Sequence, residues 1–124
     1  MGISKKNRRK IIRHGKVFYW YVNPDYDDAG KIKVHILSED KKFIVAYEVG
    51  QVSRMGKSPY LVVMGREFTG YRLQRTGYIR VRTPAWDDFP ATPLLVGKII
   101  DWCCSEKKEI VLVDWKGELI SDNL

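Results

Sequence analysis

The segment KIKVHIL, at positions 31–37, alternates between polar and apolar residues along most of its length. A period of two is typical of a β-strand with one buried face, because successive side chains of an extended chain point to opposite sides. We expect three residues to face inward, Ile32, Val34 and Ile36, and three outward, Lys31, Lys33 and His35. The turn-forming SED follows, and KKFIVAYEV then has the composition of a returning strand. The pattern predicts an antiparallel meander.

The N-terminal part of the chain predicts another hairpin. RKIIR begins at Arg9, His14 and Gly15 form a two-residue turn, and KVFYWYV returns to Val22. Glycine in second place suits a type I′ turn, which needs positive φ at both central positions. Both faces of the returning strand are largely apolar. This favours a central strand covered on both sides, with at least one aromatic face in the core.

The C-terminal part predicts one helix. In TPLLVGKIIDWCCSEKK, Thr92 suits the N-cap and Pro93 the first helical position. An apolar stripe recurs at helical spacing through Leu95, Val96, Ile99, Ile100 and Cys103. Short apolar strands precede the helix at YLVVMG and YIRVR, and EIVLVDW predicts a final strand near 109–115. We therefore expect an α+β fold: a mostly antiparallel sheet of roughly six to eight strands, with one C-terminal helix near 92–105 packed on it.

The length of 124 residues is that of one domain. We expect residues 1–8 to be a mobile basic tail and residues 9–124 a single globular α+β domain. No apolar run approaches the ~20 residues that span a bilayer, and the basic N-terminus lacks the apolar region of a signal peptide. The adjacent Cys103 and Cys104 do not suit ordinary disulfide geometry, which predicts free thiols. These features predict a cytoplasmic protein with no membrane partner.

Positive charge is concentrated in two segments. Residues 1–16 carry seven Lys or Arg and no acid, which accounts for the whole formal net charge of +7. The remainder of the chain is neutral. Within it, residues 54–82 hold seven basic residues against the single acid Glu67. A basic face would need the fold to bring these two segments together.

Catalytic motifs are absent from the sequence. No GxSxG, HExxH, Walker or GxGxxG pattern occurs. His14 is predicted in a turn and His35 on the outward face of a strand, while Cys103 belongs to the apolar stripe of the helix. We therefore expect no enzymatic activity and no cofactor.

Acidic residues cluster in two predicted loops. Asp25, Asp27 and Asp28 begin like a calcium-binding loop, but the later ligand positions are apolar, so an EF-hand is excluded. Asp25 could still meet Asp87 and Asp88 to form a divalent-ion site or an acid–base pair. Solvated acids that cap turns are the favoured interpretation, so we expect no metal site.

The favoured functional class is a non-enzymatic binding module. One candidate ligand is nucleic acid, because basic side chains neutralise phosphates and tyrosines among arginines offer stacking surfaces. The candidate contact residues are Lys5, Lys6, Arg8, Arg9, Lys10, Arg13, Arg72, Arg75, Arg80 and Arg82. Such binding is expected to be weak, independent of base sequence and steeply dependent on salt.

Three segments carry a resemblance to other proteins: KVFYWYVNPDYDD, HILSEDKKFIVAYEVGQ and WCCSEKKEIVLVDW. They resemble a group of short uncharacterised bacterial proteins with a Trp-rich strand, an Asp-Tyr-Asp-Asp loop and a late helix. The resemblance covers the chain from about Arg9 and implies a bacterial protein, but no activity or site. A different hypothesis is an immunity or antitoxin-like partner of another bacterial protein, since small size and solvent-accessible aromatic residues suit such an interface.

Overall fold

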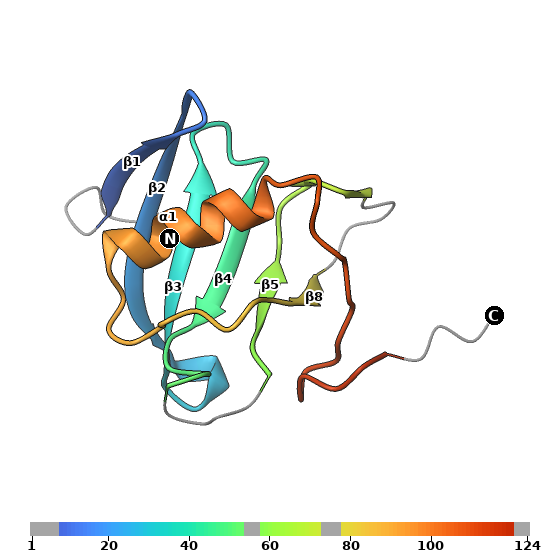
Figure 1. The fold of residues 1–124 in the computed structure, drawn as a ribbon. Helices are drawn as coiled ribbons and strands as arrows, with labels where there is room; N and C mark the ends of the chain where they lie inside the picture. Colours follow the sequence, from blue (N-terminus) through green and yellow to red (C-terminus); the bar gives the residue numbers. More distant parts are fainter. Residues whose placement is uncertain (1–7, 54–57, 73–77, 121–124) are drawn as a thin grey trace.

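The computed structural model describes residues 8–53, 58–72 and 78–120 (Figure 1). The main antiparallel sheet contains six strands in the order β1 (Arg9–Arg13), β2 (Lys16–Asp25), β3 (Lys31–Ser38), β4 (Ile44–Glu48), β5 (Tyr60–Val63) and β8 (Ile79–Arg82). The remaining elements are a 3-10 turn, η2 (Tyr26–Asp28), a separate pair of strands, β6 (Glu67–Phe68) and β7 (Tyr71–Arg72), and one helix, α1 (Pro93–Cys103). This confirms the predicted α+β fold.

The first hairpin forms as its turn residues predict. His14 and Gly15 have φ values of 55° and 71°, as a type I′ turn requires. The register pairs Arg9 with Trp20 and Arg13 with Lys16. β2 then continues to Asp25 and pairs with β3 along its length. The strand is therefore paired on both of its edges.

Helix α1 begins where the capping residue predicts. The Thr92 hydroxyl accepts a hydrogen bond from the backbone N–H of Leu95 at 3.1 Å. At the other end, the Lys108 ammonium group donates to the carbonyl oxygens of Cys103, at 2.8 Å, and Ser105, at 2.7 Å. A cation here also interacts favourably with the helix dipole. The predicted apolar stripe is buried.

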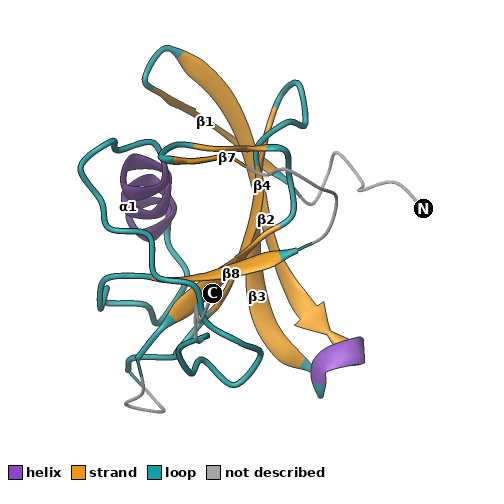
Figure 2. Ribbon diagram, turned by 90° about the vertical axis from the view of Figure 1, so that its right-hand side faces the viewer, coloured by secondary structure: helices purple, strands orange, loops and turns teal. Residues whose placement is uncertain are grey.

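The core lies between α1 and one face of the sheet. Figure 2 shows the helix on one side of the strongly curved strands. The largest fully buried side chains are Tyr47, Phe18, Ile36, Leu61, Leu95, Ile99 and Ile100. Along β3, Val34 and Ile36 are buried as predicted, but Ile32 is 41% exposed. Ile32 lies opposite Pro24, near the start of β3, and its carbonyl oxygen accepts a hydrogen bond from the backbone N–H of Val49 at 2.9 Å.

The predicted final strand over 109–115 is reduced to isolated bridges. Backbone hydrogen bonds join Arg82 N–H to Val111 and Val113 N–H to Arg80, which places Leu112 opposite Val81. The chain then reverses in a turn closed by Gly117 N–H and the carbonyl of Asp114, at 2.8 Å. The reversal ends the pairing with β8 after one bridge. No helix in the described parts of the chain is long and apolar enough to cross a membrane.

Candidate functional site

The sheet has an inner face, which packs on α1, and an outer face directed away from the helix. No described helix other than the single turn η2 lies on the outer side in Figure 2. Strand register identifies the outer residues because Tyr21 pairs with His35, His35 with Ala46, Ala46 with Val62, and Val62 with Arg80. These five residues form one row across five strands.

Strand β2 divides its aromatic residues between the two faces. Phe18 and Trp20 point into the core and are 2% and 6% exposed. Tyr19 and Tyr21 alternate with them on the outer face and are half-buried. The alternation follows from the pleat of the strand. One set of rings therefore builds the core, while the other remains accessible.

The outer tyrosines already take part in stacking contacts. The Tyr21 and His35 rings are stacked, with centroids 4.7 Å apart and planes 8° from parallel. The Arg8 guanidinium lies 4.2 Å from the centroid of the Tyr19 ring. We call Arg8, Tyr19, Tyr21 and His35 the aromatic strip. The sequence did not predict the Tyr21–His35 pair, because both faces of the strand that carries Tyr21 were expected to be covered.

Burial tunes the titratable members of the aromatic strip. It lowers the pKa of His35, and the nearby Lys33 ammonium lowers it further. The imidazole is therefore neutral at pH 7. Burial also raises the pKa of Tyr21, which keeps its hydroxyl protonated. At neutral pH the strip presents two uncharged stacked rings, together with the cation of Arg8.

A groove of about 410 Å³ lies on the outer face beside the aromatic strip. Its floor includes the small side chains of Ala46 and Val62, between His35 and Arg80 in the same row. The walls are aromatic and charged, and include Asp25, Asp28, Lys31, Lys33, Glu48, Tyr60, Tyr78 and Trp115. The Tyr60 hydroxyl donates to the carbonyl oxygen of Trp115 at 2.8 Å, which connects the groove to the C-terminal turn.

Ion pairs neutralise one end of this groove. The Lys33 ammonium lies 2.9 Å from Asp25 and 2.8 Å from Asp28. Hydrogen bonds from Lys33 lower the pKa of both carboxyl groups. Burial lowers the pKa of Lys33, but its bonds to the two carboxylates outweigh this effect and raise it. Both acids are therefore occupied as ion-pair partners of the same strand residue.

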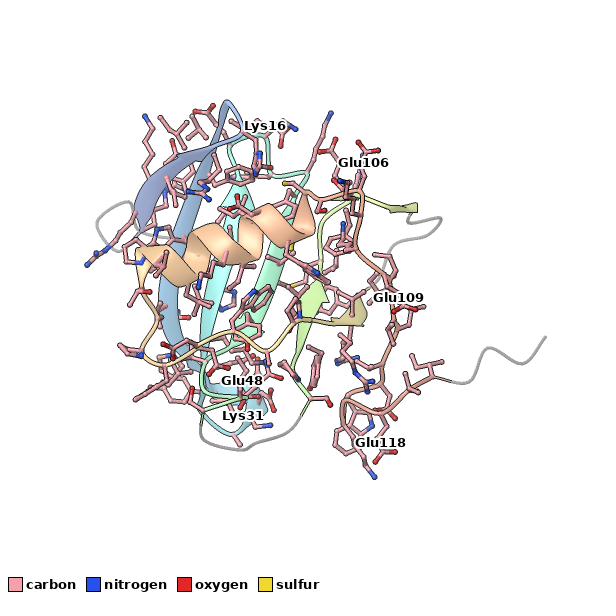
Figure 3. All side chains as sticks on the ribbon, in the orientation of Figure 1. Lys16, Lys31, Glu48, Glu106, Glu109 and Glu118 are labelled. Carbon is pink, nitrogen blue, oxygen red and sulfur yellow. The ribbon has the colours of Figure 1, made fainter. Side chains whose placement is uncertain are left out.

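The groove also contains a looser ion pair, between Lys31 and Glu48. Figure 3 shows these two residues near each other at the lower end of the sheet. Their nitrogen and oxygen atoms are 3.9 Å apart, which exceeds hydrogen-bond distance. The Glu48 side chain is only 11% exposed. This carboxylate is shielded from solvent and retains acceptor capacity.

The two acidic loops do not converge. Asp25 pairs with Lys33 on the outer face, whereas Asp88 is fully buried and accepts a hydrogen bond from the inner-face residue Tyr47 at 2.7 Å. Asp87 is exposed. Among the described residues, no group of three His, Cys, Asp or Glu side chains is placed to hold a metal ion. Asp25, Asp87 and Asp88 therefore do not form the divalent-ion site or acid–base pair that the sequence left open.

Hydrogen bonds from several donors surround the buried carboxylate of Asp88. Its carboxylate also accepts hydrogen bonds from the backbone N–H of Val52, at 2.9 Å, and Ser53, at 3.1 Å, and from the Ser53 hydroxyl. Burial acts to raise the pKa of Asp88, but the hydrogen bonds from Ser53, Val52 and Tyr47 outweigh it and lower that pKa. The residue fixes the turn after β4 to the loop before α1.

The predicted nucleic-acid contacts are distributed over both sides of the sheet. Register places Lys10 and Arg80 on the outer face, and Arg8 lies there over Tyr19. Arg9 lies on the inner side beside Trp20, and Arg13 is bound to Asp101 of α1.

Register also places Arg82 on the outer face, opposite Tyr60. Arg82 donates to the carbonyl oxygen of Gly117 at 3.3 Å, so the C-terminal turn restrains it. Arg72 belongs to the separate strand pair, and Lys5, Lys6 and Arg75 lie outside the described residues. Among the described residues, the structure thus places Arg8, Lys10 and Arg80 on the face that carries the outer tyrosines, together with Arg82, which the C-terminal turn restrains.

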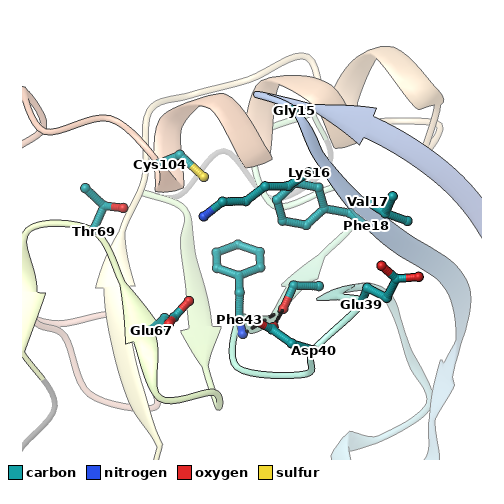
Figure 4. A pocket seen from close by; sticks show the side chains of 11 residues that line it. Gly15, Lys16, Val17, Phe18, Glu39, Asp40, Phe43, Glu67, Thr69 and Cys104 are labelled. Carbon is teal, nitrogen blue, oxygen red and sulfur yellow. Dashed lines mark hydrogen bonds between the residues drawn. The ribbon is translucent and has the colours of Figure 1, made fainter.

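A second cavity, of about 340 Å³, lies near the end of α1. Figure 4 shows the Lys16 ammonium directed toward the Cys104 thiol, with Glu67 and Thr69 across the opening. Burial raises the pKa of Cys104 despite the opposing effect of Lys16. Burial also raises the pKa of the fully buried Cys103. Both groups are protonated thiols at neutral pH, which are poor nucleophiles.

Comparisons with known proteins give no further guide to this site. No family model matches the chain, and neither a curated protein nor a solved structure matches it.

Proposed function

We propose that the protein is a non-enzymatic binding module whose outer sheet face binds single-stranded nucleic acid. The observation that carries this proposal is the aromatic strip, in which Tyr19, Tyr21 and His35 share one face with Arg8. Bases stack on such rings regardless of their identity, and arginine adds cation–π interactions. Unpaired bases have free faces for stacking, which duplex bases lack.

Cations at both edges of the face support the same ligand. Arg8 and Lys10 lie at the β1 edge and Arg80 on β8 at the other. At about 4.8 Å per strand, these edges are about 24 Å apart along the sheet. Binding surfaces for single strands combine a cationic track with aromatic platforms in this way. A strand crossing the sheet could place phosphates at each edge and bases on the central rings.

A cytoplasmic location fits this ligand. The two cysteines are free, as expected for a reducing compartment. The bacterial origin implied by the sequence resemblance is compatible with it. We retain the basic N-terminus as an additional electrostatic contact that strengthens binding without base preference.

The test is fluorescence anisotropy of labelled single-stranded and double-stranded oligonucleotides at low and physiological salt. Tyr21→Ala should weaken single-strand binding by about tenfold because it removes a stacking platform. Arg8→Gln should reduce the slope of log affinity against log salt by about 0.7, the value for one lost phosphate contact on a single strand. Lys98→Gln is the matched control, since this exposed cation lies on α1 and outside the proposed face.

A chain lacking residues 1–7 separates the tail from the sheet. Binding that disappears on truncation and is insensitive to Tyr21→Ala would assign the interaction to the tail and contradict the proposed face. Absence of binding even at low salt would reject nucleic acid and favour the alternative of an immunity or antitoxin-like protein partner.

A further inference from the structure

We infer that the groove beside the aromatic strip accepts one guanine base of the bound strand and reads it through Glu48. This inference depends on the proposed binding of single-stranded nucleic acid. It assigns the groove a role that differs from the stacking and phosphate contacts of the rest of the face.

The groove has the shape of a pocket for a flat ring. Ala46 and Val62 are small residues on neighbouring central strands, whereas their neighbours in the same row are His35 on one side and Arg80 on the other. The large side chains therefore stand on both sides of a shallow apolar floor. A volume of about 410 Å³ falls within the usual range of ligand pockets, about 300–1,000 Å³.

Among Asp25, Asp28 and Glu48, Glu48 has the carboxylate oxygens most available to accept hydrogen bonds from a base. Asp25 and Asp28 are each within 2.9 Å of Lys33 and are therefore occupied. Glu48 has only the 3.9 Å contact with Lys31, and its side chain is the least exposed of these three acids. Register places it opposite Lys33 on the outer face, two residues from Ala46 of the apolar floor. An ionised carboxylate offers two acceptor oxygens and no donor.

Guanine is the base that complements such a group. Its Watson–Crick edge presents two adjacent donors, N1–H and the N2 amino group. Adenine, cytosine and thymine each present a donor next to an acceptor on that edge. Single-stranded bases are commonly recognised on this edge while their faces stack on aromatic side chains. A carboxylate facing any base other than guanine would therefore lie beside at least one acceptor.

The rim of the groove can hold the rest of the nucleotide. Trp115 is 67% exposed at this rim and offers a large ring to a neighbouring base or sugar. Arg80, on the other side of the floor from His35, provides a cation for an adjacent phosphate. The Lys31 ammonium lies 3.9 Å from the Glu48 carboxylate, outside hydrogen-bond distance, and leaves its oxygens available as acceptors. Base reading and backbone contact therefore involve separate groups.

The experiment compares three labelled nonamers on the full chain at fixed salt. They are oligothymidylate, the same strand with one central guanine, and the same strand with hypoxanthine in place of guanine. We expect about tenfold tighter binding of the guanine strand than of oligothymidylate, as for one bidentate contact. The hypoxanthine strand, which lacks the N2 amino group, should lose most of this gain. The three ligands test the inference without altering the protein.

A variant assigns the preference to its residue. Glu48→Gln should abolish the preference for guanine, so that the guanine and thymidine strands bind equally. Glu118→Gln changes an exposed acid outside the groove and should retain that preference. Equal binding of all three nonamers by the unmodified chain, or a preference that survives Glu48→Gln, would overturn the inference and leave the proposed function intact. If none of the nonamers binds at low salt, the proposed function itself fails.

Discussion

The guanidinium of Arg13 forms a bidentate ion pair with the carboxylate of Asp101, which connects the first hairpin to helix α1. Nε donates to one carboxylate oxygen at 3.1 Å, and Nη2 donates to the other. The Nε2 atom of His14 lies 2.9 Å from the first oxygen. Two planar groups paired in this way fix orientation as well as distance. The edge strand of the sheet is thus held from the side of α1.

Asp101→Asn should loosen the hairpin without unfolding the chain. The amide retains the shape of the side chain but loses its charge and one acceptor for Arg13. We expect faster hydrogen exchange of the backbone amides in β1, with little change in β4. Asp87→Asn, at an exposed acid outside this contact, is the control. Exchange in β1 that matches the unmodified chain would show that β2 alone fixes the edge strand.

The same contact predicts a response to acid. The hydrogen bond from Arg13 lowers the pKa of Asp101 below its usual 3.8. A carboxyl group with a lower pKa in the folded state stabilises the fold above about pH 3.8, and this contribution is lost as the pH falls through the folded pKa. Exchange in β1 should therefore accelerate below pH 3.8 in the unmodified chain and change less in Asp101→Asn, after correction for intrinsic exchange rates.

Ile99→Asp should destabilise the protein by about 4 kcal/mol or prevent folding, because it places a charge without a partner in the core. Ile99 is fully buried on the inner side of α1. Leu94→Asp is the matched control, since Leu94 is 68% exposed on the same helix. Thermal and urea unfolding measure both variants. A melting temperature of Ile99→Asp equal to that of the control would contradict the packing of the helix.

Asp88→Asn should lower the free energy of unfolding by about 2–3 kcal/mol. The amide NH₂ group of the new side chain would replace one acceptor oxygen and face the buried donors that now bond to it. Tyr47→Phe removes only one of those donors and should cost about 1 kcal/mol. Urea denaturation measures both. An Asp88→Asn variant as stable as the unmodified chain would show that the buried carboxylate does not fix the turn after β4.

Acid unfolding should depend on Asp88 as well. Its folded pKa is held below the usual 3.8 by hydrogen bonds, in spite of the opposing effect of burial. The stabilisation is therefore complete well above pH 3.8 and disappears as the pH falls through the folded value. Asp88→Asn cannot titrate, so its stability should vary less with pH below 3.8. Parallel pH profiles for the two chains would exclude this linkage.

Gly65→Ala should cost about 3 kcal/mol because a Cβ atom at this position has no room. It would lie 2.6 Å from the backbone nitrogen of Ile44 and still closer to the carbonyl oxygen of Lys42. Ile44 belongs to β4 and the Lys42 carbonyl accepts a hydrogen bond from Glu67 N–H, so these backbone atoms cannot move aside as a flexible side chain can. Calorimetric unfolding should detect the loss, and a cost below 1 kcal/mol would refute the tight approach of the two segments.

Gly30→Ala provides a contrast for Gly65→Ala. Gly30 has a φ of +73°, but no atom lies within 4 Å of its added Cβ. The cost there should be only the backbone strain of about 1–2 kcal/mol. The ranking of the two alanine variants therefore separates steric crowding from conformational strain.

The strands and the helix could be predicted because their signals are local. Alternation in KIKVHIL marks a half-buried strand, and the Thr92 cap, which bonds to Leu95 as expected, marks the start of α1. The His14–Gly15 turn likewise has the positive φ values that its residues suggest. Each of these features depends on residues within a few positions of one another. The segment near 109–115 was less predictable, because its pairing ends at the reversal after Asp114.

The site could be predicted only in part because its residues meet through strand register. Tyr21 stacks on His35 only because β2 and β3 pair in one particular register. The groove floor needs two further pairings, which bring Ala46 beside His35 and Val62 beside Ala46. Asp88 illustrates the same limit. WDDF suggests a solvated loop, yet Tyr47 and the turn after β4 enclose this carboxylate. No local pattern contains those partners.

The division of β2 into two sets of aromatic rings constrains how the chain can change over evolution. Substitutions at Tyr19 and Tyr21 can alter ligand preference with little effect on the core, since Phe18 and Trp20 carry the packing. Insertion of one residue before this run would have the opposite effect, because it would exchange the two faces along the whole strand. We therefore expect related chains to vary freely in the identity of these outer rings while the spacing of the hairpin stays constant.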